Sequence, residues 1–264
     1  MNIDELDRYL RALLSIEAFD DLDASQNGLQ VSCSKKPIRK IAFAVDACLE
    51  NFHKAKQQHA DMLFVHHGLF WNKSLLLTGS HYKRLAYLIQ NDMALYAVHL
   101  PLDADPVYGN NAGIARNLSL CEIEPFGIYH GVPIGVKGRL VAPNSANNTT
   151  DENGCRLDEV LTRLFKRGEE ARTVLPFGPE KIQTVGIISG AASGDLPQAI
   201  SAGLDCFITG EVKHEAYHQA LENKITVIAG GHYQTETFGV QNVMEKLAAD
   251  THIETIFLDT PTGL

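Results

Sequence analysis

The sequence predicts an α/β protein made of two related domains, each with a central sheet flanked by helices. The first observation behind this prediction is that short, nearly continuous apolar runs alternate with helical patterns, which is typical of parallel strands covered on both faces. The second is that the order of elements repeats in the second half of the chain, which indicates an internal duplication. Alternating elements in any α/β protein would mimic part of this repeat, so the duplication is a hypothesis.

The first half opens with an amphipathic helix, because apolar residues from Ile3 to Leu14 fall at helical spacing. The dipeptide Asn27-Gly28 then signals a turn. Strands and helices are expected in alternation after it, at residues 41–45, 49–59, 62–65, 81–91 and 93–98.

The second half repeats this order, with strands and helices expected at residues 185–188, 195–203, 206–209, 214–223 and 225–229. A final helix and a strand at 255–258 follow. The segment 126–172 between the halves is less regular. It holds a strand-like stretch, a polar stretch at 144–154 that indicates an exposed loop or hairpin tip, and a short amphipathic helix from Leu157. We therefore predict domains at 1–125 and 126–264.

Composition narrows the class of protein. The 264 residues carry a formal net charge of -9, which argues against an extended nucleic-acid surface and against an anionic membrane surface. A nucleotide-sized ligand stays compatible, because a metal site can locally outweigh the surface charge. No apolar run is long enough to span a membrane, and the acidic N-terminus does not resemble a signal peptide. The five cysteines form no C-x-x-C pair, which favours reduced thiols and a cytoplasmic location.

Candidate metal ligands follow the predicted strands, at the edge where parallel α/β sheets bind ligands. They are His66, His67, Asp103, His232 and Glu236. Imidazole and carboxylate groups together suit Zn, Fe, Mn or Co. A carboxylate can also bridge two ions at a separation of roughly 3.5–4 Å. Glu236, four residues after His232, is the best candidate bridge, and Asp103 is the next. The pattern predicts a site for two divalent metal ions.

Each signal has an ordinary explanation when it is taken alone. A pair of histidines is usually exposed or hydrogen-bonded, and an aspartate after a proline is usually a turn or cap residue. Two further candidates are weaker. His99 would orient a metal ligand without binding the metal itself, or it would be a buried, hydrogen-bonded histidine. Glu211 would line the cleft, or it would be an acid favoured at a helix N-terminus. The coincidence of all these residues at strand ends favours the metal site.

These residues lie in stretches that resemble a known family, the NIF three-like dinuclear-metal proteins, which are also named GTP cyclohydrolase 1 type 2 homologs. The stretches are Asn27-Gly28-Leu29-Gln30-Val31, VHHGLFW at 65–71, HLPLDADPVYGNN at 99–111, FITGEV at 207–212 and GHYQTE at 231–236. They occur in the family's order and span nearly the whole chain, so together they are highly specific. One departure is Asp105, where close relatives often have histidine, and the long domain that some members insert between the halves is missing.

The resemblance implies two α/β domains that face each other across a cleft containing the metal ions. It implies two divalent ions per subunit, with the family's ligands carried over onto His66, His67, Asp103, His232 and Glu236. It also implies a toroidal homohexamer. The implied activity is that of a two-metal hydrolase which opens the imidazole ring of a purine nucleotide such as GTP. The alternative is a non-catalytic, metal-bound ring that serves as a binding or regulatory protein. No acid or base residue can be assigned from the sequence.

Overall fold

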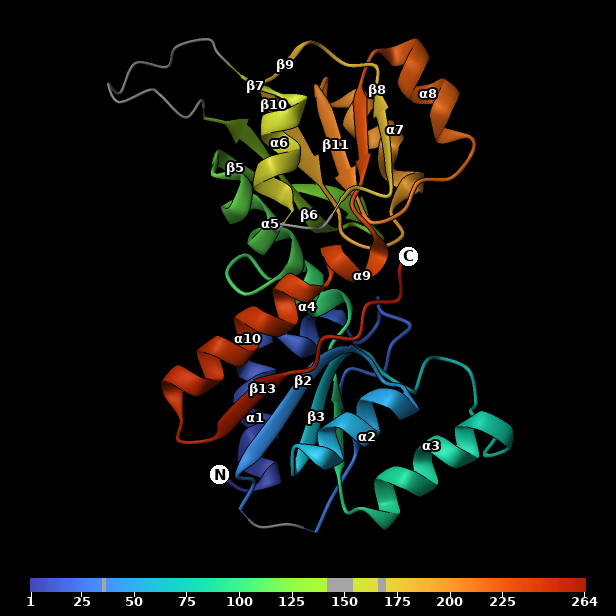
Figure 1. Cartoon of the computed structure of the whole chain (residues 1–264), viewed down its shortest axis with the longest axis vertical. Coiled ribbons are helices and arrows are strands. Elements are labelled where there is room, and N and C mark those ends of the chain that lie inside the picture. The colour runs from blue at the N-terminus through green and yellow to red at the C-terminus, as the bar shows by residue number, and fades with distance from the viewer. Residues whose placement is uncertain (35–36, 142–153, 166–169) are drawn as a thin grey trace. The chain divides into compact units, whose positions relative to one another are not determined.

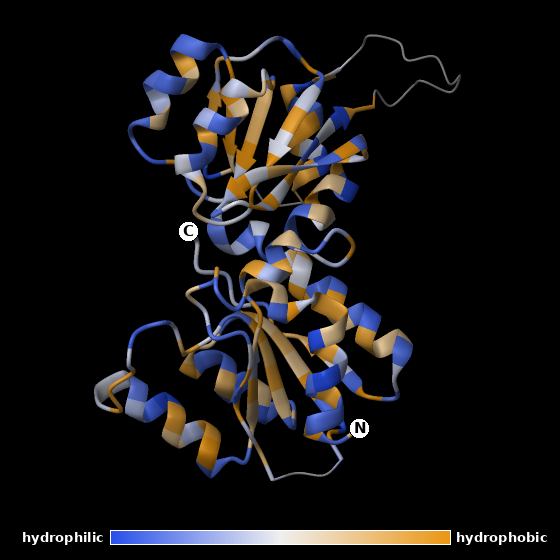
Figure 2. Cartoon of the chain, turned by 180° about the vertical axis from the view of Figure 1, so that it is seen from behind, coloured by the Kyte–Doolittle hydropathy of each residue, from blue (hydrophilic) through white to orange (hydrophobic). Residues whose placement is uncertain are grey.

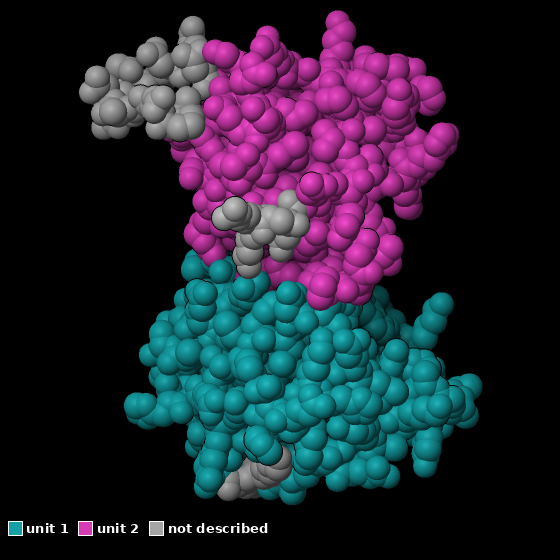
Figure 3. Space-filling view, viewed as in Figure 1, with its two compact units in different colours: residues 1–109, 239–260 teal, residues 110–238, 261–264 magenta. Residues whose placement is uncertain are grey.

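The computed structural model describes residues 1–34, 37–141, 154–165 and 170–264, which divide into two compact units (Figure 3). Unit 1 contains residues 1–109 and 239–260, and unit 2 contains 110–238 and 261–264. This division differs from the predicted boundary at 125/126 in two ways: residues 110–125 pack with the unit 2 core and sheet, and the last helix and strand belong to unit 1. Of the polar stretch predicted as a loop at 144–154, only Gly154 lies among the described residues.

Unit 1 is built on a five-stranded sheet in the order β1-β4-β3-β2-β13. Its strands are β1 (Gly28–Val31), β2 (Lys40–Asp46), β3 (Met62–His67), β4 (Ala94–Ala97) and β13 (Glu254–Phe257). The four strands from β4 to β13 are parallel, and β1 is antiparallel to β4. The strands at 41–45, 62–65 and 93–98 are therefore confirmed. The last predicted strand becomes the parallel neighbour of β2.

Helices cover both faces of the unit 1 sheet, as the continuous apolar strands predict. Figure 1 shows α2 and α3 on one side of the sheet, and α1 and α10 on the other. The helices are α1 (Ile3–Leu14), η1 (Ile16–Phe19), α2 (Leu49–Gln57), α3 (Gly79–Gln90), α4 (Leu100–Ala104) and α10 (Thr237–Asp250). Phe52 of α2 and Leu88 of α3 pack with Leu63 and Leu95 of the sheet in one core cluster. Alternate strand residues form a row on the opposite face, where Phe64 stacks on Tyr96 and contacts Phe43 in a tilted arrangement.

Unit 2 is built on a six-stranded sheet in the order β5-β6-β10-β11-β12-β8. Its strands are β5 (Leu120–Tyr129), β6 (Val132–Leu140), β8 (Thr173–Pro176), β10 (Thr184–Ile187), β11 (Cys206–Thr209) and β12 (Thr226–Ala229). A separate two-stranded sheet pairs β7 (Cys155–Arg156) with β9 (Lys181–Ile182). The run β10-β11-β12 is parallel, which confirms the strands predicted for the second half.

The helices of unit 2 also lie on both faces of its sheet (Figure 1). They are α5 (Asn110–Leu118), α6 (Leu157–Leu164), η2 (Ser193–Asp195), α7 (Leu196–Ser201), α8 (Ala216–Asn223) and α9 (His232–Thr235). Residues of α5 and α6 pack against Ile187, Ile208 and Ile228 in a second core cluster. Figure 2 shows the same pattern in both units, with hydrophobic strands and helices that alternate between hydrophobic and hydrophilic residues. Among the described residues, no helix has the length and apolar character that crossing a bilayer requires.

Candidate metal centre

The first group of predicted ligands lies at the carboxyl edge of the unit 1 sheet. His66 and His67 are the last two residues of β3, and His99 lies between β4 and α4. Asp103 is in the short helix α4 and is buried. The ligand nitrogens of His66, His67 and His99 all lie within 4.8 Å of one another. The strand ends therefore bring three imidazoles from two neighbouring parallel strands to one place.

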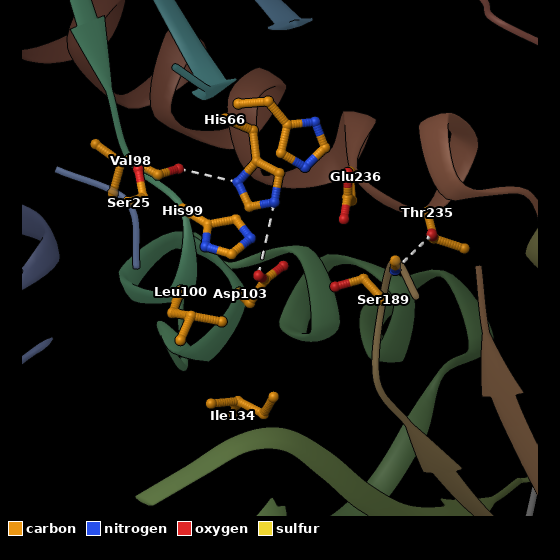
Figure 4. A network of polar contacts seen from close by, with 12 residues as sticks. Ser25, His66, Val98, His99, Leu100, Asp103, Ile134, Ser189, Thr235 and Glu236 are labelled. Carbon is orange, nitrogen blue, oxygen red and sulfur yellow. Dashed lines mark hydrogen bonds and ion pairs between the residues drawn. The ribbon is translucent and has the colours of Figure 1, made fainter. Parts of the chain in front are cut away.

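The His66 ring is completely buried and is held from both sides (Figure 4). Its Nδ1 lies 2.9 Å from the carbonyl oxygen of Val98, and its Nε2 lies 3.6 Å from Oδ2 of Asp103. Because a carbonyl oxygen only accepts hydrogen bonds, Nδ1 must carry a proton. In the neutral ring the lone pair is then on Nε2, on the side of the Asp103 carboxylate. This is the tautomer that binds a metal through Nε2.

Carboxylates hold the other two imidazoles in the same way. Nδ1 of His67 lies 2.9 Å from Oδ1 of Asp46, the last residue of β2. Nδ1 of His99 lies 2.8 Å from Oδ1 of Asp23. A histidine that donates its second ring N–H to a carboxylate or carbonyl oxygen is the usual arrangement of metal-binding histidines. Neither Asp23 nor Asp46 was among the predicted site residues.

Asp23 is a buried carboxylate that ties the site to the rest of unit 1. Burial raises its pKa, but the hydrogen bonds from His99, Asn27 and the Ser25 backbone more than offset this, so its pKa lies below the ordinary value. The backbone N–H of Leu100 also donates to it. The side chain of Asn27 in turn accepts a hydrogen bond from the backbone of His99 at 2.7 Å. Asn27 of the Asn27-Gly28 motif therefore fixes the backbone just after β4 and the carboxylate that contacts His99.

The second group of predicted ligands lies at the carboxyl edge of the unit 2 sheet. His232 is the first residue of α9, and Glu236 follows the last. Nε2 of His232 lies 3.2 Å from Oε1 of Glu236, and its Nδ1 lies 2.5 Å from Oε1 of Glu211. The structure therefore places Glu211 behind the imidazole of His232, where it fixes the ring. Glu236 is buried, with 3% of its surface exposed.

Charge and space at this edge both suit a cation. Burial alone would lower the pKa of His232, but the carboxylates of Glu236 and Glu211 more than offset this and raise the pKa to about 9. The protein thus gathers negative charge around this imidazole, which favours a positive charge there. Gly190, which has a positive φ, makes room for the acid, because a Cβ at this position would collide with the Glu236 carboxylate.

Asp105 has a local structural role. Its Oδ1 accepts hydrogen bonds from the backbone N–H groups of Val107 at 2.9 Å and Tyr108 at 2.6 Å. A short aspartate side chain commonly closes a turn in this way. The turn leads from α4, which carries Asp103, toward α5.

Comparisons with known proteins agree on one family. The family model Duf34/NIF3 (NGG1p interacting factor 3) matches residues 1–263. The chain is 47% identical to the "GTP cyclohydrolase 1 type 2 homolog" of Treponema pallidum (strain Nichols) and 42% identical to that of Archaeoglobus fulgidus, with complete coverage of all chains. It also superimposes on the crystal structure of TTHA1606 from Thermus thermophilus with a TM-score of 0.86, at 41% identity and complete coverage of both chains. The chain belongs to the Duf34/NIF3 family.

Proposed function

We propose that the protein binds two divalent metal ions per subunit and uses them in a hydrolytic reaction. The proposed ligands are the five predicted from the sequence: His66, His67, Asp103, His232 and Glu236. The observation that carries the proposal is the hydrogen bonding of the imidazoles, which fixes their orientation and tautomer. The Nδ1 atoms of His66, His67 and His232 each face an oxygen atom at 2.5–2.9 Å, which leaves Nε2 as the metal-binding nitrogen.

The donor set agrees with the metals expected from the sequence. Two carboxylates and three imidazoles suit Zn, Fe, Mn or Co better than Mg or Ca, which prefer oxygen ligands throughout. Asp103 and Glu236 are both buried, and buried carboxylates are normally paired with a cation or hydrogen-bonded. That all five side chains serve one dinuclear centre is a prediction from the family resemblance.

The chain's own groups would prepare the site in a defined way. When bound, the ions would supply Lewis acidity and a water of lowered pKa. Asp46 and Glu211 hold the rings of His67 and His232 in their metal-binding tautomer. Gly190 leaves the space that the Glu236 carboxylate occupies. The carbonyl oxygen of Val98 likewise accepts the Nδ1–H of His66 and holds its ring in the metal-binding tautomer.

We propose a purine nucleotide as the substrate class, with hydrolytic opening of the imidazole ring. The support is that the curated relatives carry the name GTP cyclohydrolase 1 type 2 homolog. We further propose a toroidal homohexamer in the cytoplasm. A native mass measurement tests the hexamer directly, since any other subunit number contradicts it.

Metal analysis combined with an activity panel tests the proposed function. Purified protein is loaded with Mn, Zn, Fe or Co, desalted, and assayed for bound metal and for turnover of GTP, other nucleotides and phosphoesters. We expect two ions per subunit, turnover of a purine nucleotide, and loss of both properties in His67→Ala. His252→Ala removes an exposed histidine of unit 1 and should change neither. Tight metal binding without turnover would contradict the hydrolase and support the binding or regulatory protein, and no metal binding would contradict both.

A further inference from the structure

Trp71 is the single tryptophan of the chain, and the proposed metal centre does not use it. We propose that Trp71 binds the base of the nucleotide, with the planar heterocycle stacked on a face of its indole ring. This inference rests on the proposed function in taking a purine nucleotide as the substrate class. It adds the residue that holds the base and the kind of contact by which the base is recognised.

The indole ring lies against the two imidazoles of unit 1 that solvent reaches. Its centroid lies 5.0 Å from that of His99, at an interplanar angle of 74°, and 6.4 Å from that of His67. The side chains of His67 and His99 are 21% and 23% exposed, whereas that of His66 is completely buried. Trp71 is itself partly exposed. A ligand that approaches these imidazoles from solvent therefore comes within reach of the indole.

The loop that carries Trp71 is held by residues from two of the sequence motifs. The side-chain oxygen of Gln30 accepts hydrogen bonds from two backbone N–H groups of this loop, at 2.7 and 3.3 Å. Gly68 makes room for this contact, because a Cβ there would lie 2.4 Å from the Gln30 side chain. The backbone on each side of Trp71 is also hydrogen-bonded to residues 24–26. The indole is therefore held in place before any ligand binds.

The polar atom of the indole is already used within the loop. Its Nε1–H donates to the carbonyl oxygen of Gly68 at 3.2 Å, which leaves the π system as the means of contact with a ligand. Stacking on an aromatic ring suits any base, because every base has a π-face. Since stacking makes no hydrogen bond to the edge of the base, this contact should contribute equally to guanine and adenine. The site is therefore expected to accept purine bases in general.

Intrinsic tryptophan fluorescence tests this contact directly, because it reports on Trp71 alone. The full-length protein is loaded with Zn²⁺ and titrated with GTP, ATP and ribose 5-phosphate, and each signal is read at once after mixing. Titration of free tryptophan corrects for light absorbed by the nucleotides, and equilibrium dialysis measures binding independently. We expect GTP and ATP to quench Trp71 saturably, with the dissociation constants that dialysis gives. Ribose 5-phosphate, which has no base, should leave the fluorescence unchanged.

Two substitutions at Trp71 separate the π face from the bulk of the ring. Trp71→Leu should weaken binding of GTP and ATP by the same factor, about 5–150-fold, as expected for the loss of one stacked base. Trp71→Phe keeps a smaller π face and should recover part of this loss. Bound zinc per subunit should stay at the wild-type level in both variants, since the oxygen partners of the imidazoles are unchanged. Tyr82→Leu is the matched control, because it removes a ring of α3 that is 60% exposed, and it should change none of these values.

The outcomes separate this inference from the proposed function. If wild type binds GTP but its fluorescence does not change, or if Trp71→Leu binds GTP as tightly as wild type, the stacking contact is refuted while the proposed function stands. Binding of GTP without binding of ATP would refute recognition by stacking. Loss of zinc together with nucleotide in Trp71→Leu would make the indole a structural support of the imidazoles. If wild type binds zinc but no nucleotide, the purine substrate and this inference both fail. The wild-type titration decides the question even if a variant fails to fold.

Discussion

The two units share one framework but carry different chemistry at the same edge of their sheets. In unit 1, Phe43, Phe64 and Tyr96 lie in register across three parallel strands. In unit 2, Ile187, Ile208 and Ile228 lie in register across the corresponding three. When the two sheets are aligned on these rows, equivalent positions are Asp46 and Gly190, His66 and Gly210, His67 and Glu211, and His99 and Gly231. The strand ends that carry imidazoles in unit 1 therefore carry mainly glycines in unit 2.

This difference teaches how one framework can supply two kinds of ligand. Where a strand ends in histidine, the ligand comes from the strand itself. Where it ends in glycine, the neighbouring backbone approaches closely, since a Cβ at Gly210 would lie 2.6 Å from the carbonyl oxygen of Gly190. The candidate ligands of unit 2 lie instead in and after the helical turn that follows the strand, at His232 and Glu236. The candidate ligands of unit 1 are mostly imidazole nitrogens, whereas in unit 2 one imidazole lies between two carboxylates.

The largest effect is expected from the central core row. Phe64→Ala removes a fully buried ring that packs against Phe43 at 5.1 Å and Tyr96 at 5.9 Å. Truncating a buried phenylalanine lowers unfolding free energy by about 3–5 kcal/mol. Ile208→Ala, its counterpart in unit 2, should lower it by about 2–5 kcal/mol. Urea unfolding followed by circular dichroism checks both values, and a change below about 1 kcal/mol at either position would show that the rows are not equivalent cores.

The next effect tests a pair of aspartates that support the predicted duplication. Oδ2 of Asp61 accepts backbone hydrogen bonds from Arg39 and Lys40 at the start of β2. Oδ2 of Asp205 accepts the same pair from Gln183 and Thr184 at the start of β10. Asp61→Ala and Asp205→Ala remove the acceptor altogether and should each lower stability by about 1.5–3 kcal/mol, as expected for hydrogen bonds to a charged group.

The control for these aspartates is Asp21→Ala, which removes an exposed carboxylate. Thermal unfolding of the three variants gives the comparison. Equal losses for Asp61 and Asp205, with little change for Asp21, would sharpen the equivalence of the two units. A loss at only one of them would mean that the matching contacts do not have matching energies.

A smaller effect is expected where unit 2 has glycine and unit 1 has Asp46. Gly190→Ala places a Cβ against the Glu236 carboxylate, at a residue with a φ of 66°. The strained backbone alone should lower stability by about 1–3 kcal/mol. The displaced carboxylate should also weaken metal binding. Gly194→Ala is the matched control, because a Cβ there meets no atom within 4 Å. Metal titration and thermal unfolding of both variants check this, and an unchanged Gly190→Ala protein would contradict the role of this glycine.

The sequence predicted the framework well because its signals are local. The apolar runs at 41–45, 62–65 and 225–229 became buried parallel strands, and the histidines at or just after their ends became candidate ligands. The terminal strand was assigned to the wrong half, since pairing of β13 with β2 joins residues 254–257 to residues 40–43 and leaves no local trace. The role of Asp23 was not predicted for the same reason, because its contact with His99 joins residues that are 76 positions apart. Asp46 could have been found, since it ends an apolar strand just as His67 does.

The smallest effect compares the acids behind His67 and His232. Asp46→Asn and Glu211→Gln keep an oxygen that can accept the imidazole proton but remove the negative charge that strengthens the bond. Each should lower metal affinity by about tenfold, or about 1.4 kcal/mol, with little effect on folding. Competition with a chelator of known affinity measures this for each variant, with Asp21→Asn as the control. A tenfold loss at Glu211 with none at Asp46 would leave His67 outside the metal centre and restrict binding to the acidic edge of unit 2, whereas the reverse result would assign the metal to the imidazoles of unit 1.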